Sequence, residues 1–338
     1  MHVVVIGATG NVGTSVLAAL RGEPGARIVG VARRMPDPRL AEIATGVEFR
    51  AADIVRDDLV ALLRGADAVI HLAWLIQPGR DRELMHAVNV EGSRRVFDAA
   101  VQAGVPAILY ASSVGAYSPG PKHRRTDESW PTGGIRSSFY SRHKAAVERL
   151  LDRLESEQPQ LRVVRLRPGL IFKAQAADEI RRYFIGHLAP RSVFRRRLIP
   201  VVPELPSLRF QAVHSLDVGD AFRRAVLSDA RGAFNVAADP VLGPAELATV
   251  LGARLAPVPG ALLRLGADVS YRLHLQPVEP GWLDMALQVP IMETGRVRRE
   301  LGWQETKDGV GALSELIDGL GEGTDLPTPP LKARYSSA

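Results

Sequence analysis

The sequence predicts an α/β protein built on a doubly wound parallel β-sheet, followed by a smaller and mostly helical lobe. Three observations lead to this prediction. Short β-branched apolar runs alternate with amphipathic helical patterns through the first half, the first run turns through a glycine loop into a helix, and the alternation ends near residue 168. Such alternation is typical of a parallel sheet that is covered by helices on both faces.

The individual elements follow from local patterns. Each expected strand is a short run rich in Val, Ile and Leu, and each expected helix has apolar residues at three- and four-residue spacing. The expected strands are 2–6, 27–32, 47–50, 67–72, 106–111 and 161–166, and the expected helices are 11–21, 56–64, 81–103 and 138–157. The last two helices are long enough to meet a second copy of the chain, so we expect a homodimer.

The rhythm changes after residue 168, where prolines and arginines accumulate. A strand-like run (208–214), a helix (216–229) and a strand (232–238) then return to the first pattern, and 244–320 reads as mostly helical. The end of the chain is rich in Gly, Pro, Ser and Thr, as disordered tails are. We therefore expect a dinucleotide-binding domain (1–168 and 208–238), a substrate-binding lobe (169–207 and 239–320) and a disordered tail (321–338).

Composition narrows the possible functions. The 338 residues include no cysteine, which excludes disulfides, thiolate catalysis and cysteine-based metal sites. No apolar run is long enough to cross a bilayer and no signal peptide is recognisable, so we expect a cytoplasmic protein without membrane contact. The net charge is +6, but the arginines are dispersed and lack interleaved aromatics. A small molecule with anionic groups is therefore the expected partner, rather than a nucleic acid.

The glycine loop GATGNVG, Gly7–Gly13, lies between the first strand and the first helix. A strand that turns through glycines into a helix gathers backbone N–H groups at a positive helix terminus, which suits a pyrophosphate. Gly7 is expected to make the tight turn, Gly10 to let the backbone approach phosphate, and Gly13 to let the helix pack on the strand. The pattern predicts a dinucleotide site.

Tyr140 and Lys144 are four residues apart in YSRHK, so they share one face of the expected helix 138–157. A free tyrosine titrates at about 10, too high for a base at neutral pH. A neighbouring ammonium and the helix N-terminus both favour the phenolate and are expected to lower the pKa of Tyr140. The pair predicts general acid–base chemistry beside the dinucleotide.

Several blocks in this order resemble the short-chain dehydrogenase/reductase superfamily, in its extended branch of epimerases, dehydratases and reductases. The blocks are GATGNVG, AAD ending at Asp53, HLAW (His71–Trp74), NVEGSRRV from Asn89, LYASSVGAYS (Leu109–Ser118), YSRHK, RPG (Arg167–Gly169) and RRELGW (Arg298–Trp303). The resemblance covers the chain to about residue 320 and implies a Rossmann-type fold.

The resemblance also implies roles for individual residues. Tyr140 is the expected proton donor or acceptor, with Lys144 beside it. Ser113 is expected to hydrogen-bond the substrate oxygen, with Ser112 as its rival, and Asn89 to hold a proton-relay water. Asp53 is expected to contact adenine, although a loop-capping role is the alternative. The remaining implied cofactor contacts are Thr9, Asn11, Val12, Ile54, Leu72, Ala73, Trp74, Asn89, Ser112, Pro168 and Gly169.

The end of the second strand bears on cofactor choice. An acid there binds the ribose 2′-hydroxyl of NAD, whereas arginine accommodates the 2′-phosphate of NADP. The strand ends in Ala32, followed by Arg33 and Arg34. We expect NADP(H), with NAD(H) possible if both arginines are only solvated surface groups.

Two departures from the family pattern bear on the reaction. Val114 and Gly115 follow Ser113, where related sugar dehydratases have an acidic pair, and Pro168 stands where sugar-nucleotide epimerases have an asparagine. Both favour carbonyl reduction or alcohol oxidation on a small organic substrate. Epimerisation of a sugar or sugar nucleotide is the alternative, with arginines 181–182 and 195–197 on a diphosphate. A non-catalytic regulator that senses NADP(H) is a further alternative.

His214 and Asp217, in HSLDVGDAF, invite interpretation as a metal site or a catalytic dyad. A helix-capping role for Asp217 explains this segment more simply, because aspartate before or within the first turn accepts backbone N–H bonds. We therefore expect no metal ion.

Overall fold

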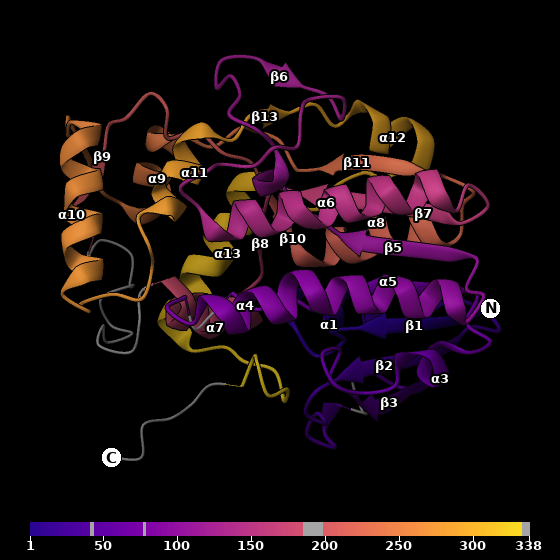
Figure 1. Ribbon diagram of the computed structural model, residues 1–338. Coiled ribbons are helices and arrows are strands. Elements are labelled where there is room, and N and C mark those ends of the chain that lie inside the picture. The colour runs from indigo at the N-terminus through magenta and orange to yellow at the C-terminus, as the bar shows by residue number, and fades with distance from the viewer. Residues whose placement is uncertain (41–43, 77–78, 185–198, 333–338) are drawn as a thin grey trace.

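The computed structural model describes residues 1–40, 44–76, 79–184 and 199–332, and its centre is a seven-stranded parallel sheet (Figure 1). The strand order is β11-β7-β5-β4-β1-β2-β3. Strands β2 and β3 follow β1 on one side, and the later strands, beginning with β4, are added on its other side. The strands are β1 (His2–Ile6), β2 (Arg27–Ala32), β3 (Val47–Ala51), β4 (Ala68–His71), β5 (Ala107–Ala111), β7 (Arg162–Pro168) and β11 (Gly232–Val236). The predicted doubly wound parallel sheet is confirmed.

Helices cover both faces of this sheet, and one buried apolar cluster lies on each side. In Figure 1, helices α5 and α6 lie in front of the strands of the sheet. On one face lie α1 (Asn11–Leu20), α8 (Ser215–Val226) and α12 (Gly295–Leu301), and on the other lie α3 (Leu59–Leu63), α5 (Gly92–Gln102) and α6 (Phe139–Glu157). The apolar runs of the strands are buried because both faces are covered.

Two expected elements differ from the structure. The single helix expected over 81–103 consists of α4 (Arg82–His86), a π-helical turn (Ala87–Glu91) and α5. Of the strand expected over 208–214, only β10 (Ala212–His214) forms, and it pairs with β8 (Leu170–Phe172) outside the main sheet. The main sheet does not receive this strand because β11 already pairs with β7 at that edge.

The lobe beyond the sheet is mainly helical, as expected, with short strand pairs between its helices. Its helices are α7 (Ala177–Phe184), α9 (Pro244–Leu251), α10 (Gly260–Arg272), α11 (Gly281–Gln288) and α13 (Gly309–Glu322). The short pairs are β10 with β8, β9 (Val201–Pro203) with β12 (Arg254–Ala256), and β13 (Ile291–Met292) with β6 (Arg125–Thr126).

The segment around α12 does not follow the expected division of the chain. Val297, Leu301 and Trp303 belong to the sheet's own apolar cluster, although 239–320 was expected in the lobe. The Trp303 indole is fully buried and donates to the Asp217 carbonyl oxygen at 2.8 Å. This part of the chain therefore returns to the sheet and packs beside α8.

The C-terminal segment 323–332 packs against the rest of the protein, whereas disorder was expected from residue 321. Leu331 and Thr328 are buried, and the Asp37 backbone N–H donates to Pro327 O at 3.1 Å. The Arg182 guanidinium donates to the carbonyl oxygens of Pro330 and Lys332. This segment thus connects the loop after β2 with α7, while 333–338 lie outside the described residues.

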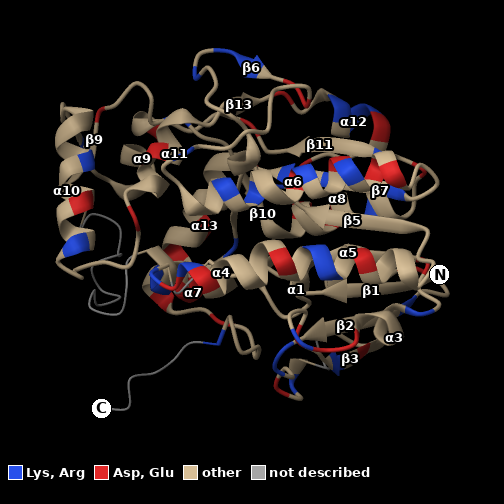
Figure 2. Cartoon of the chain, viewed as in Figure 1, with Lys and Arg blue, Asp and Glu red and all other residues tan. Residues whose placement is uncertain are grey.

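Opposite charges alternate on the surface of the described chain. Figure 2 shows basic and acidic residues interspersed along α5, α6 and α7. On α5, Arg94 pairs with both Glu91 and Asp98. Among the residues that the structure describes, no helix is long and apolar enough to cross a bilayer.

The turn from β1 into α1 depends on two glycines that allow close backbone contact. Gly7 has a φ of +89°, and a Cβ there would lie 2.6 Å from Ala73 N. A Cβ on Gly13 would lie 2.2 Å from Gly7 O, closer than any carbon and oxygen can approach. Both positions therefore require glycine, as the sequence predicted for a tight turn and for helix packing.

Gly13→Ala is expected to lower the free energy of unfolding by roughly 1–3 kcal/mol, because the added methyl group forces α1 away from the loop. Urea denaturation measures this change. Gly22→Ala is the matched control, since nothing lies within 4 Å of a Cβ there. Equal stability of the two variants would contradict the packing role of Gly13.

Candidate active site

A cleft of about 620 Å³ opens at the carboxyl ends of the central strands. It lies where β1 and β4 adjoin, the region where open α/β sheets bind ligands. The predicted cofactor residues that line it are Gly7, Thr9, Gly10, Arg33, Arg34, Ile54, Leu72, Ala73 and Trp74. The cleft therefore brings together residues from four separate βα loops.

The floor of this cleft fits a pyrophosphate group. Gly10 is the N-cap of the ten-residue helix α1 and has no side chain to satisfy the helix's first N–H groups. Free N–H groups at a helix N-terminus suit a phosphate oxygen. Asn11, Val12 and Gly13 lie behind the loop and do not line the cleft.

The lobe supplies the opposite wall, which the sequence did not predict. Glu179, Arg182 and Tyr183 of α7 line the cleft across from Arg33 and Arg34. Burial raises the pKa of Glu179 to about 7, although the Tyr183 hydroxyl donates to its carboxylate at 2.9 Å and opposes the shift. The acidic first turn of α7 gave no signal that this helix faces a glycine loop far away in the sequence.

Two prolines of the C-terminal segment complete this wall. Pro329 and Pro330 line the cleft, and the Pro330 carbonyl oxygen accepts a hydrogen bond from Arg182. Arg182 also pairs with Asp178. The segment expected to be disordered is thus part of the site.

Ser113 and Tyr140 meet beside the carboxyl end of β5. The Ser113 hydroxyl oxygen caps the following 3₁₀ turn by accepting from Gly115 N at 3.0 Å, and the Ser113 side chain lowers the pKa of Tyr140. A Cβ on Gly115 would lie 2.9 Å from Cε1 of Tyr140, so this glycine lets the ring lie flat against the turn. Ser138 caps α6 by accepting from Ser141 N, which starts the helix just before Tyr140.

The pKa of Tyr140 is raised to about 12, opposite to the lowering expected from the sequence. Burial causes the increase, and the neighbouring Ser113 side chain offsets only part of it. The Lys144 ammonium lies 5.8 Å from the centroid of the Tyr140 ring. The general acid form of Tyr140 is therefore the stable form at neutral pH.

Lys144 is almost fully buried, and its ammonium group is held by neighbours from three elements. It donates to Ala111 O at 2.7 Å and to the Tyr110 hydroxyl at 3.3 Å, and it lies 3.5 Å from the Trp74 ring centroid. Burial keeps the pKa of Lys144 well below its usual value, while Glu148 raises it. Trp74 thus separates Lys144 from the cleft that it also lines.

Asn89 and Asp53 make local contacts in the structure. The Asn89 carboxamide accepts from Leu75 N at 2.7 Å and donates to Leu75 O at 2.8 Å, so it holds the loop that carries Trp74. The Asp53 carboxylate accepts a hydrogen bond from Val55 N at 2.9 Å. This contact matches the loop-capping role that was the alternative for Asp53. The predicted relay water and adenine contact remain predictions for these two residues.

The other predicted residues lie around the site rather than in the cleft. Ser112 donates to Glu148 Oε1 at 2.5 Å, which leaves Ser113 as the hydroxyl beside Tyr140. Pro168 ends β7, and a Cβ on Gly169 would lie 2.4 Å from Gln211 O. Gly169 therefore permits the close crossing of two segments, and its contact with a cofactor stays a prediction.

His214 and Asp217 have structural partners, but the roles differ from those expected. His214, not Asp217, is the N-cap of α8, because its ring accepts from Leu216 N. Asp217 accepts from Thr306 N at 3.0 Å and from Thr306 Oγ1 at 2.6 Å. Asp217 thereby fastens the loop after Trp303 to α8, so the capping interpretation of Asp217 is wrong.

Two residues beside Tyr140 and Lys144 were missed. Trp282 of α11 packs on Tyr140 with ring centroids 4.7 Å apart, and nothing in its local sequence indicates this contact. Glu148 is fully buried one helical turn after Lys144. Its four-residue spacing from Lys144 was visible, but the same spacing is usual for surface ion pairs on helices.

The fold and the site together define a dinucleotide-binding protein of the doubly wound α/β class. A model of the NAD dependent epimerase/dehydratase family matches residues 3–237, and the chain belongs to this family. The predicted resemblance to the extended short-chain dehydrogenase/reductase branch is confirmed.

Curated relatives include dehydrogenases. Sterol-4-alpha-carboxylate 3-dehydrogenase ERG26 of Saccharomyces cerevisiae is 27% identical over 179 residues, which is 50% of this chain and 51% of that protein. The 3 beta-hydroxysteroid dehydrogenase type 7 of Homo sapiens is 31% identical over 170 residues, 48% of this chain and 44% of that protein. The chain thus spans about half the length of these relatives.

Solved structures share the fold over nearly the whole chain. The structure of gox2253 has a TM-score of 0.72 at 22% identity and covers 95% of this chain and 98% of its own. A UDP-glucose-4-epimerase from Stenotrophomonas maltophila with bound NAD has a TM-score of 0.71 at 21% identity, covering 96% and 98%. At such identities the likeness shows the fold alone.

Removal of residues 324–338 is expected to weaken NAD⁺ binding by roughly three- to tenfold, the effect of about 1 kcal/mol. The truncation removes the proline wall of the cleft and the carbonyl oxygens that hold Arg182. Isothermal titration calorimetry measures the dissociation constant. A chain shortened only by 333–338 is the control, and equal affinities for the two chains would show that the wall does not contribute.

Proposed function

We propose that this protein is an NAD(P)(H)-dependent oxidoreductase that reduces a carbonyl or oxidises an alcohol on a small organic substrate. The observation that carries the proposal is the placement of Tyr140 against the turn that Ser113 caps, near Lys144 and beside a cleft that fits a dinucleotide. A cofactor-sensing regulator without catalysis needs no such arrangement of acid, oxyanion donor and buried cation. Retention of all three residues supports an enzyme.

The chain's own residues support acid–base catalysis at one oxygen of the substrate. Tyr140, protonated at neutral pH, would donate its proton to a carbonyl oxygen and recover it from the alcohol in the reverse direction. Ser113 would hydrogen-bond the same oxygen and stabilise developing alkoxide charge. The nicotinamide, when bound, supplies or accepts the hydride. Lys144 would favour the tyrosinate through its nearby positive charge.

The surroundings of Tyr140 favour an apolar substrate. Trp282 packs on its ring, Trp74 approaches edge-on with centroids 5.9 Å apart, and Phe184 packs against Trp282 at 4.8 Å. Such aromatic walls bury flat apolar groups well and offer few partners to sugar hydroxyls. The sterol dehydrogenases among the relatives are consistent with this choice.

Sugar-nucleotide epimerisation is the second candidate from the sequence, and the arginines proposed for it have other partners. Arg181 and Arg182 both pair with Asp178 on their own helix. Arginines 195–197 lie outside the described residues. The paired guanidinium groups support a structural role at α7 rather than binding of a diphosphate.

Arg33 and Arg34 support NADP(H) as the preferred cofactor. Both are exposed, both line the cleft, and they directly follow Ala32 at the end of β2. A carboxylate at Ala32 would repel a 2′-phosphate, and none is present there.

Tyr140→Phe is expected to lower turnover by roughly 10²- to 10⁴-fold, because the substrate oxygen loses its proton donor. The assay follows reduced nicotinamide with a panel of sterols, simple ketones and UDP-sugars, and separates epimerised sugars chromatographically. Tyr271→Phe is the control, since Tyr271 lies on α10 and does not line the cleft. Undiminished turnover in Tyr140→Phe would refute the assignment, and epimerised sugar without net redox change would favour the second candidate.

The double substitution Arg33→Ala and Arg34→Ala is expected to weaken NADP⁺ binding by roughly 10- to 100-fold, the value of one or two charge-assisted hydrogen bonds. NAD⁺ binding should change little. Arg50→Ala is the control, because Arg50 pairs with Glu48 and does not line the cleft. Tighter binding of NAD⁺ than NADP⁺ by the unaltered protein would overturn the preference.

A further inference from the structure

One carboxylate inside the protein has no place in the function proposed so far. Glu148 is fully buried on α6, one turn after Lys144 and two turns after Tyr140, on the same helical face. A buried carboxylate is costly unless charged or polar partners surround it. Its position on the face of α6 that also carries Tyr140 and Lys144 calls for an account of what it holds.

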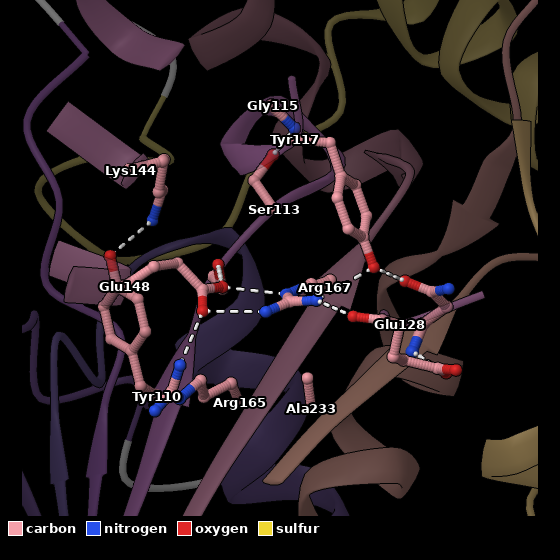
Figure 3. Close-up of polar contacts among 12 residues, drawn as sticks. Tyr110, Ser113, Gly115, Tyr117, Glu128, Lys144, Glu148, Arg165, Arg167 and Ala233 are labelled. Carbon is pink, nitrogen blue, oxygen red and sulfur yellow. Dashed lines mark hydrogen bonds and ion pairs between the residues drawn. The ribbon is translucent and has the colours of Figure 1, made fainter. Parts of the chain in front are cut away.

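The Glu148 carboxylate binds three side chains from two strands (Figure 3). Arg167 forms a two-pronged contact, with Nε 2.9 Å from Oε1 and Nη2 2.9 Å from Oε2. Arg165 Nη1 lies 3.0 Å from Oε2, and Ser112 Oγ lies 2.5 Å from Oε1. This arrangement joins α6 to β7 and to the residue just before Ser113.

Each arginine is anchored further on its outer side. Arg167 Nη1 donates to the Tyr117 hydroxyl at 3.0 Å and to Glu128 O at 2.9 Å. Arg165 also pairs with Asp152 and Glu155 toward the surface. Glu148 therefore sits in a rigid frame, because a guanidinium fork held on both sides fixes the carboxylate geometrically.

The charge balance around Glu148 is uneven. Three buried cations surround it: Lys144, Arg165 and Arg167. The groups that face the Lys144 ammonium are Tyr110 and Ala111 O from β5, Trp74 from the loop after β4, His71 from β4, and Tyr140 and Glu148 from α6. Of these groups, Glu148 alone is a carboxylate.

We propose that Glu148 is a positioning residue that holds Ser113, through Ser112, in register with Tyr140 and provides the buried counter-charge for Lys144. The proposal rests on the function proposed above for Ser113, Tyr140 and Lys144. The register depends on the short Ser112 contact, since Ser112 and Ser113 are adjacent on the chain. The counter-charge matters because Lys144 and Glu148 are both buried one turn apart on α6, and the Glu148 charge raises the pKa of the buried Lys144 ammonium.

Glu148→Gln tests the counter-charge without any substrate. The chain contains five lysines, so biosynthetic ¹³C-lysine labelling gives few NMR signals, and Lys144→Arg assigns one of them. Loss of the carboxylate is expected to move the Lys144 titration down by about one pH unit. An unchanged Lys144 titration in a folded Glu148→Gln protein would overturn this part of the proposal.

Asp152→Asn is the matched control. It removes a carboxylate from the same helix and the same Arg165 partner, but its side chain is 59% exposed. The Lys144 titration should not move in this variant. A shift equal to that of Glu148→Gln would show a general effect of helix charge and would overturn the specific role.

Glu148→Asp separates the positioning role of Glu148 from its charge. It also provides a test of the proposal if the Glu148→Gln protein does not fold. It keeps the carboxylate but shortens its reach to Ser112, so the Lys144 titration should stay near that of the unaltered protein while kcat falls at least tenfold and KM changes little. Wild-type kcat in Glu148→Asp would overturn the positioning part. The substrate is the one found in the Tyr140→Phe screen.

The two proposals fail in different ways. If Tyr140→Phe retains full turnover while the Lys144 titration shifts in Glu148→Gln, the proposed chemistry is wrong and the counter-charge stands. If Tyr140→Phe is inactive while both Glu148 variants behave as the unaltered protein, the chemistry stands and the role of Glu148 is wrong.

Discussion

The packing of α6 against the ends of β5 and β7 is the constraint on which the catalytic geometry depends. This helix carries Tyr140 and Lys144, whereas Ser113 comes from β5. Glu148 accepts two hydrogen bonds from Arg167 and one from Ser112. It thereby joins α6, β7 and the end of β5 in the interior. An ion pair in such a place adds little net stability, but it tolerates only one alignment of its partners. Alignment of Ser113 with Tyr140 is the role proposed for it.

The cofactor cleft is assembled from parts that are far apart in the chain. The glycine loop and Arg33 come from the first strands, Tyr183 from the lobe, and Pro330 from the C-terminal segment. The lobe thus closes over the carboxyl edge of the sheet instead of forming a separate domain. Trp303, which follows the lobe helices in the chain, packs in the sheet's core and so joins the two parts.

Much of the sheet and part of the site could be predicted, because they depend on local patterns. The strand ranges and the glycine requirements at Gly7 and Gly13 follow from apolar periodicity and from turn sterics. The proximity of Ser113 and Tyr140 followed from family likeness. The strand expected over 208–214 was wrong for most of its length, because its apolar run resembles that of a strand at a sheet edge. In the structure β11 is the edge strand beside β7, and only β10 forms, paired with β8.

The sequence by itself determined the fold class, the family, the glycine turn and the helical face shared by Tyr140 and Lys144. Each of these depends on spacing within one short segment. The tertiary structure alone decided that the pKa of Tyr140 rises, that Pro330 borders the cleft, and that Glu148 is buried beside three cations. Burial and charge partners come from segments distant in sequence, so local patterns do not contain them.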